Sequence, residues 1–204
     1  MNEPSIKGAA FRELILWYGR SWDGGRERLQ SIVADLPPRL ATLVRPNEPA
    51  LGLLASTWYP SALCNTMLDG VCAGLSPAVR ARMVREGTEA VATTLLRGLY
   101  KWLFAMLASP ERYARYIGRG WRQLHSTGER YMAITGPGRA ESAILDWDGH
   151  HPVLCEITTE TMSVLFTQMG CKQVRTTRTA CVSSGAADCR TMLSWEPATR
   201  ARTP

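Results

Sequence analysis

The spacing of apolar residues changes along the C-terminal third of the chain, from alternation to helical period and back to alternation. Polar and apolar positions alternate over residues 131–135, stop at Gly136-Pro137-Gly138, and give way to a second β-rich segment over residues 140–147. Two such runs around a glycine and proline break predict a hairpin. Apolar residues then recur at helical spacing from Val153 to Met169, which predicts one helix.

A second hairpin is expected after this helix. Gly170 stands where a C-terminal helix cap belongs. The segments Cys171–Cys181 and Cys189–Trp195 are rich in Thr, Val and Arg, and Ser183-Ser184-Gly185 between them is a turn signal. Residues 128–196 therefore predict the order hairpin, helix, hairpin (ββαββ), which is an antiparallel sheet with a helix across it, and an α+β fold class.

The chain before residue 128 is predicted to be helical. Apolar stripes at helical spacing, prolines at helix starts and glycines near helix ends mark its elements. The expected helices cover residues 8–18, 25–36, 61–75, 77–107 and 109–124, and prolines interrupt residues 36–60. The second half of 77–107 is apolar on all sides, which favours a central core helix, or else a helix shared with a partner chain.

This pattern predicts how the chain is divided. Residues 1–127 form a helical region, residues 128–196 form the sheet region, and we expect the two to pack as one domain. Residues 197–204 carry prolines and arginines without periodicity and are expected to be a flexible tail.

Composition narrows the possible partners and the compartment. The net charge of +6 would suit an acidic partner, but the basic residues are scattered among acidic ones and no recognition motif accompanies them, so nucleic-acid binding is not expected. The chain shows no apolar leader and no run long enough to span a bilayer. With six cysteines and no such leader, we expect a reducing cytoplasm and free thiols.

No catalytic motif is recognisable, so no residue is assigned a catalytic role and an enzyme is the less favoured class. Histidine is the natural place to look for a ligand, and the chain has three. His125 ends an apolar helical face, where it is either a satisfied cap or a ligand directed into a cavity between helix and sheet. His150 and His151 lie in a loop, where neighbouring residues point in different directions and solvation is the simpler interpretation.

Cys181 and Cys189 are expected to lie opposite each other in a hairpin centred on Gly185. The same register would place Thr179 opposite Thr191. A zinc site would require a shorter interval than the one between Cys181 and Cys189, and two further ligands, so no metal is predicted. A structural role at the neck of the hairpin and a reversible disulfide both stay open.

Several short motifs are distributed over most of the chain. They are Ile6-Lys7-Gly8 with Phe11, Leu36-Pro37, Trp58-Tyr59-Pro60, Arg85-Glu86-Gly87, Ser109-Pro110, Trp121, Gly128-Glu129, Gly136-Pro137-Gly138-Arg139-Ala140, Cys181 to Gly185 and Cys189 to Trp195. In their order and spacing, these motifs resemble a myxobacterial family of uncharacterised proteins of about this length.

The C-terminal half is also distantly similar to the superfamily of 4-vinyl reductase domains, haem-nitric-oxide-binding domains and subunits of the TRAPP transport particle. That resemblance implies helices packed on an antiparallel sheet with a hydrophobic ligand between them. The Tyr-x-Ser-x-Arg motif of the haem branch is absent and only His125 is roughly placed, so haem is expected to be unlikely and the cofactor unknown.

These observations favour a cytoplasmic domain that binds a small hydrophobic molecule and acts as a sensor or regulator. Its apolar pocket is expected between the helices and one face of the sheet. The candidate lining is Trp102, Phe104, Tyr116, Trp121, His125, Cys181, Cys189 and Trp195. The alternatives are a dimeric interaction module without a ligand, paired through the apolar helix, and an enzyme of tetrapyrrole-like metabolism. A filled core made of the same residues would equally explain their pattern.

Overall fold

The computed structural model describes residues 3–97 and 109–196. Its helices are α1 (Gly8–Ser21), α2 (Gly25–Ala34), α3 (Pro38–Ala41), α4 (Ser61–Cys72), α5 (Pro77–Arg97), α7 (Pro110–Leu124) and α8 (Pro152–Gln168), with 3-10 turns at Pro49–Gly52 and Val182–Ser184. Its strands are β1 (Ser5–Lys7), β2 (Trp58–Pro60), β3 (Glu129–Gly136), β4 (Arg139–Leu145), β5 (Lys172–Ala180) and β6 (Cys189–Glu196).

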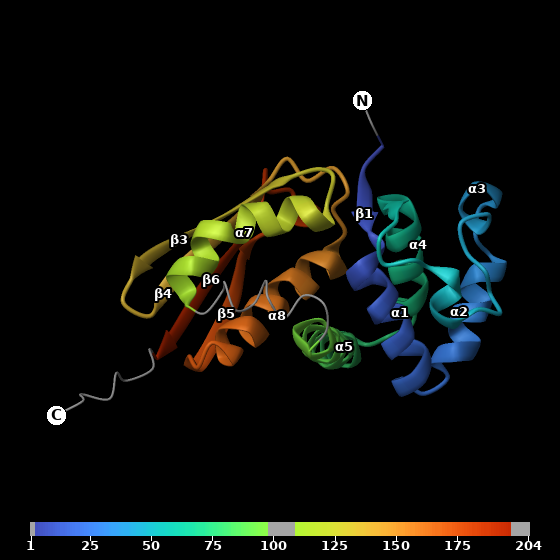
Figure 1. The fold of residues 1–204 in the computed structure, drawn as a ribbon, viewed down its shortest axis with the longest axis horizontal. Coiled ribbons are helices and arrows are strands. Elements are labelled where there is room, and N and C mark those ends of the chain that lie inside the picture. The colour runs from blue at the N-terminus through green and yellow to red at the C-terminus, as the bar shows by residue number, and fades with distance from the viewer. Residues whose placement is uncertain (1–2, 98–108, 197–204) are drawn as a thin grey trace.

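Four strands form one antiparallel sheet in the order β3-β4-β6-β5. Along β6 the residues alternate strictly between buried and exposed, because successive side chains point to opposite faces. Helices α7 and α8 cover the buried face, as Figure 1 shows. The predicted order of hairpin, helix and hairpin and the α+β class are therefore confirmed.

The sequence-based register of the second hairpin is wrong by one residue over most of its length. The structure pairs Arg178 with Thr191, whereas the sequence prediction placed Thr179 there. A bulge between Arg178 and Ala180 shifts the pairing, and beyond it Ala180 lies opposite Arg190. The shift leaves Cys181 and Cys189 facing each other at the closed end of the hairpin.

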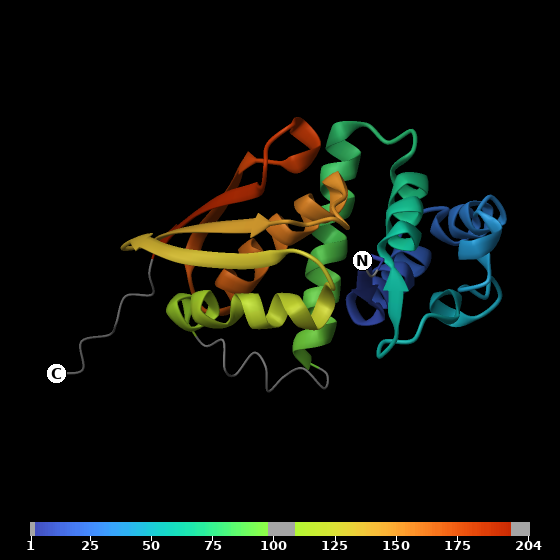
Figure 2. The ribbon, with the colours of Figure 1, turned by 90° about the horizontal axis from the view of Figure 1, so that it is seen from above.

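The helices predicted over residues 8–18, 25–36, 61–75 and 109–124 are present. The helix predicted over 77–107 is present as far as Arg97, and the rest of that prediction lies outside the described residues. Helix α5 lies between helices α1 to α4 and the sheet with its two helices (Figure 2). The helix predicted over residues 8–18 continues to Ser21. The small β1–β2 sheet was not predicted, since three-residue strands are too short to show a period. Ile6 of β1 also forms a bridge to His125, which fixes the end of α7 to the N-terminal part.

The buried residues fall into two clusters. The larger extends from α1, α2 and α4 through Trp121 and Trp147 to Cys155, Cys181 and Cys189. The smaller fills the space between α7, α8 and the sheet around Phe166. The larger cluster thus crosses residue 128, although the division into regions stays a prediction.

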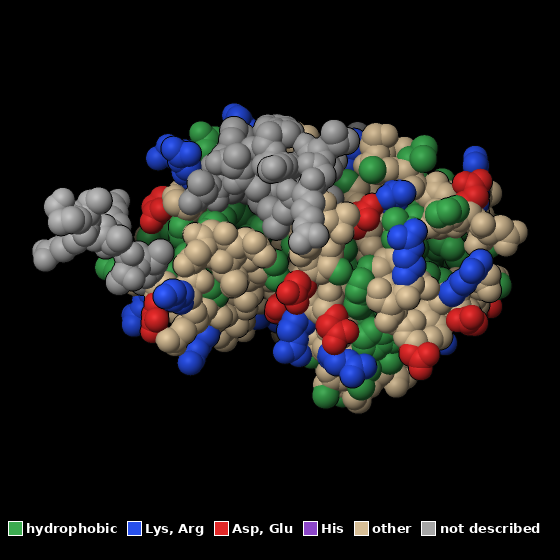
Figure 3. Space-filling view, turned by 60° about the horizontal axis from the view of Figure 1, so that its bottom comes forward, with side chains coloured by type: hydrophobic (Ala, Val, Ile, Leu, Met, Phe, Trp, Pro, Cys, Tyr) green, Lys and Arg blue, Asp and Glu red, His purple; other side chains and the backbone are tan. Residues whose placement is uncertain are grey.

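Surface charge and hydropathy agree with the sequence analysis where the structure describes them. On the face in Figure 3, lysine and arginine side chains are interspersed with acidic ones instead of forming one basic patch. Among the described helices, none is both long and apolar enough to cross a membrane.

Candidate functional site

One imidazole and three thiols meet where α8, β5 and β6 come together. His150 lies in the loop before α8, Cys155 in the first turns of α8, Cys181 just after β5 and Cys189 at the start of β6. Their potential ligand atoms all lie within 4.8 Å of one another. The three cysteines are buried and His150 is partly buried. We call these four residues the thiol cluster.

Local sequence signals put each member in place. His151 caps α8 by accepting a hydrogen bond from the Val153 N–H at Nδ1, and Pro152 occupies the first helical position. Because α8 begins at Pro152, Cys155 lies on the side of the helix that faces the second hairpin. At the other side Gly185 adopts φ +85°, a left-handed conformation that glycine adopts without strain, and it closes the turn between Cys181 and Cys189.

The distances within the cluster are short. The Sγ atoms of Cys181 and Cys189 are 3.9 Å apart, and the Cys181 Sγ is 3.4 Å from the His150 Nε2. The Ser183 Oγ lies 3.1 Å from the Cys181 Sγ. No disulfide joins the cysteines of the cluster, which are all free thiols.

The thiols and a nearby guanidinium influence one another electrostatically. A hydrogen bond between Cys155 and Cys189 raises the pKa of Cys155 and lowers the pKa of Cys189, so the Cys189 sulfur carries thiolate character. Burial lowers the pKa of Arg178, but its hydrogen bond to Cys155 and the charges of Cys155, Cys181 and Glu156 outweigh burial and raise it. The thiol cluster therefore favours thiolate at one of its sulfurs and places the Arg178 guanidinium beside Cys155.

From the sequence alone, only half of this cluster, Cys181 and Cys189, is predicted to come together. No metal is predicted there because two further ligands are missing, and the structure places Cys155 and His150 beside the pair. The available signal was the spacing His150-x4-Cys155, close to the short intervals of zinc sites, but Cys155 was not among the candidate residues and His150 was assigned to a solvated loop.

A second group, the aromatic cluster, consists of Trp121, His125 and Trp147. The His125 ring stacks on Trp121 with centroids 3.8 Å apart and meets Trp147 edge-on at 5.5 Å. The Trp121 Nε1 donates to the Thr127 carbonyl oxygen. Burial, and then the charge of Arg130, lower the pKa of His125 to about 3, so its ring is neutral near pH 7.

The candidate lining residues do not converge on one cavity in the part of the chain that the structure describes. Trp195 packs edge-on against Phe166 in the smaller core cluster. Tyr116 lies on the outer side of α7. Trp102 and Phe104 lie outside the described residues. The predicted pocket lining is thus divided among the thiol cluster, the aromatic cluster, the core and a surface groove.

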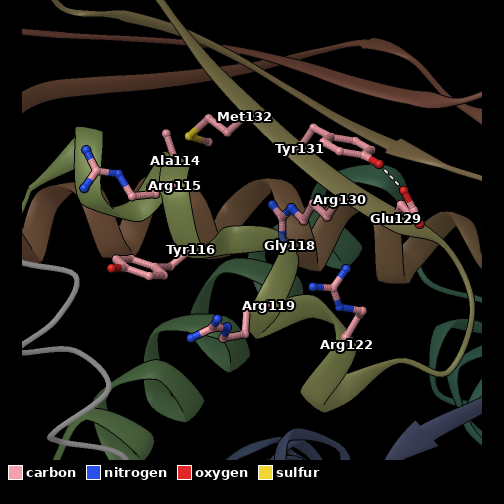
Figure 4. Close-up of a pocket in the computed structure, with 10 residues that line it drawn as sticks. All are labelled: Ala114, Arg115, Tyr116, Gly118, Arg119, Arg122, Glu129, Arg130, Tyr131 and Met132. Atoms are coloured by element: carbon pink, nitrogen blue, oxygen red, sulfur yellow. Dashed lines mark hydrogen bonds between the residues drawn. The ribbon is translucent and has the colours of Figure 1, made fainter.

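The groove between α7 and β3 has a volume of about 320 Å³ and is not apolar (Figure 4). Arginines from both elements surround it, with Tyr116 and Tyr131 among them. Its charged lining residues are Arg115, Arg119, Arg122, Glu129 and Arg130. A second groove of about 270 Å³ lies between α1, α2 and residues 46–51. Neither groove is lined by a histidine or a cysteine.

Comparison with known proteins identifies a shared fold. No known protein family and no curated protein matches the sequence. Solved H-NOX proteins match the structure over nearly all of both chains. An Fe(II) unliganded H-NOX protein from K. algicida superposes with a TM-score of 0.69 at 10% identity, covering 97% of this chain and 100% of its own. An Fe(II)NO H-NOX protein from S. oneidensis gives 0.65 at 11% identity, covering 94% and 99%.

The fold is therefore that of the H-NOX proteins, the haem-NO-binding domains to which the sequence showed a distant similarity. The expectation that haem is unlikely is contradicted by this finding, because the matching structures include an Fe(II)NO protein and one solved to probe haem distortion in the H-NOX family. The absence of the Tyr-x-Ser-x-Arg motif is not decisive, because the two chains share the fold although only 10% of their residues are identical.

All three histidines lie within the described residues, and each has a partner in the observed arrangement. The His125 ring is held between two tryptophans. The His151 Nε2 lies 3.0 Å from the Asp69 Oδ1 and its Nδ1 caps α8. The His150 Nε2 belongs to the thiol cluster. No histidine lines either groove, so an axial ligand for haem would have to come from a histidine that leaves its present partners.

Proposed function

We propose that this chain is a sensory or regulatory domain that binds a small molecule between its helical part and its sheet. The observation that supports this most is the fold, which matches ligand-binding H-NOX proteins over nearly the entire chain. A domain of this design reports on a ligand when binding changes how its parts pack. The ligand chamber would lie beside Trp121 and His125, where the larger core cluster reaches from the helices to the sheet.

Haem is the first ligand to test because the structures with this fold include haem proteins. When bound, haem would supply an iron site for a diatomic gas. His125 is the candidate axial ligand, since its lowered pKa keeps the imidazole neutral, but its ring must first leave Trp121.

The test is titration of the purified chain with haemin, followed by absorbance spectroscopy and native mass spectrometry. We expect about one haem per chain, loss of the coordinated spectrum in His125→Ala, and retention in the control His151→Asn, because asparagine keeps the helix cap. If the wild-type chain takes up no haem, or if His125→Ala binds it with the same spectrum, His125 ligation is rejected. Mass spectra of native material then identify another small molecule or none, and the latter result rejects the sensory proposal.

The dimeric module remains a second proposal. It depends on the apolar second half of residues 77–107, most of which lies outside the described residues. Light scattering at micromolar concentration tests it, and a strict monomer would contradict it. The enzyme alternative, the cytoplasmic location and the absence of nucleic-acid binding likewise stay predictions.

A further inference from the structure

We propose that His150, Cys155, Cys181 and Cys189 bind one Zn²⁺ ion in a closed tetrahedral site. This inference does not rest on the ligand chamber proposed above. The site lies at the closed end of the second hairpin, and it adjoins the aromatic cluster because the His150 ring meets Trp147 edge-on at 5.1 Å.

The geometry of the cluster matches the size of a zinc tetrahedron. Zinc binds thiolate sulfur at about 2.3 Å and imidazole nitrogen at about 2.0 to 2.1 Å, so tetrahedral angles separate two sulfurs by roughly 3.8 Å and sulfur from nitrogen by roughly 3.6 Å. The observed separations are 3.9 Å between the Sγ atoms of Cys181 and Cys189 and 3.4 Å between the Cys181 Sγ and the His150 Nε2. The widest separation in the cluster is within 4.8 Å, so binding requires side-chain shifts of roughly 1 Å or less.

The chemistry of the four groups also favours zinc. Soft thiolates with an imidazole in tetrahedral geometry select Zn²⁺ over the hard, oxygen-binding Mg²⁺ and Ca²⁺. Four protein ligands leave no open position for a substrate, so the site is a structural or regulatory one. It joins the turn between β5 and β6 to the start of α8, two segments that are far apart in the sequence.

The charge around the cluster suits a bound ion. Three thiolates and one Zn²⁺ leave a net charge of −1, and Arg178 lies beside Cys155 to balance it. Arg178 is itself within 4.0 Å of Glu156, which also pairs with Arg80 of α5 at 3.0 Å. Such outer groups orient the ligands of a metal and tune its affinity. Arg178 is therefore a positioning residue of the site.

The binding test uses the full chain, purified with a reductant and freed of metal by a chelator. Titration with Co²⁺, a coloured substitute for Zn²⁺, is expected to give sulfur-to-metal charge-transfer absorbance and tetrahedral visible bands that saturate at one ion per chain. Zn²⁺ should then displace Co²⁺ and bleach both features. A chain that gives neither feature, or that binds Co²⁺ with octahedral bands only, overturns the proposal.

Matched variants locate the site. Cys155→Ser and His150→Ala are each expected to weaken Zn²⁺ binding more than roughly 100-fold, because outer-sphere changes alone cost about 10- to 100-fold. Arg178→Met should fall within that smaller range. The control Cys72→Ser changes a thiol outside the cluster and should bind as the wild type does. Equal affinity in all variants would reject the assignment.

Metal removal gives a second measurement that does not depend on colour. Because Zn²⁺ binds the folded cluster and its binding energy adds to folding, we expect the thermal midpoint to rise with Zn²⁺ and to fall with chelator in the wild type. The shift should disappear in His150→Ala, whose partly exposed side chain can be removed without emptying the core. A wild-type midpoint that does not respond to Zn²⁺ contradicts the proposal, as does a disulfide between Cys181 and Cys189 in the reduced preparation.

Discussion

Lowering the pH from about 6.5 to about 4 is expected to reduce the free energy of unfolding by about 3 kcal/mol through His125 alone. Burial, aided by the charge of Arg130 on β3, lowers the pKa of His125 from 6.5 to about 3 in the folded chain. Between these two values the unfolded chain binds a proton at this position and the folded chain does not. The contribution of His125 to the free energy of unfolding is therefore fully present above pH 6.5. It is lost as the pH falls towards 3, at about 1.4 kcal/mol per pH unit.

Urea unfolding at a series of pH values measures this effect. Carboxylates titrate in the same range, so the comparison is with His125→Phe, whose ring can stack on Trp121 but cannot take up a proton. We expect the wild type to lose stability relative to the variant as the pH falls. Parallel curves would show that His125 is accessible to protons in the folded chain, and would contradict the burial described above.

Replacing Phe166 by alanine is expected to lower the free energy of unfolding by about 3 to 5 kcal/mol. Phe166 of α8 is completely buried and packs edge-on against Tyr113 of α7 at 5.6 Å and Trp195 of β6 at 5.0 Å. It thus joins the two helices to the sheet. Removing the ring leaves a cavity and breaks two aromatic contacts.

Chemical denaturation with circular dichroism checks this prediction, with Met192→Ala as the control. Met192 lies on β6 but on the exposed face of the sheet, so its truncation should cost no more than about 0.5 kcal/mol. A loss below about 1 kcal/mol for Phe166→Ala would contradict the filled core. It would instead support a chamber between α7, α8 and the sheet, with Trp195 in its lining.

The sequence by itself determined which elements form and in what order. The change from alternation to helical period and back predicts β3, β4, α8, β5 and β6, because each period fixes the face on which apolar side chains gather. Proline and glycine signals likewise indicated the start of α7 and the end of α8. These are local preferences, so they can be read without knowing what packs against each element.

The tertiary structure decided which side chains meet. The bulge between Arg178 and Ala180 in β5 changed the register of most of the second hairpin, and periodicity carries no signal for it. The aromatic residues expected around one ligand turned out to be distributed over separate places, because the contacts of an apolar side chain depend on how the elements dock. His150 and Cys155 joined Cys181 and Cys189 for the same reason: the start of α8 packs against the end of the hairpin, about 30 residues further along the chain.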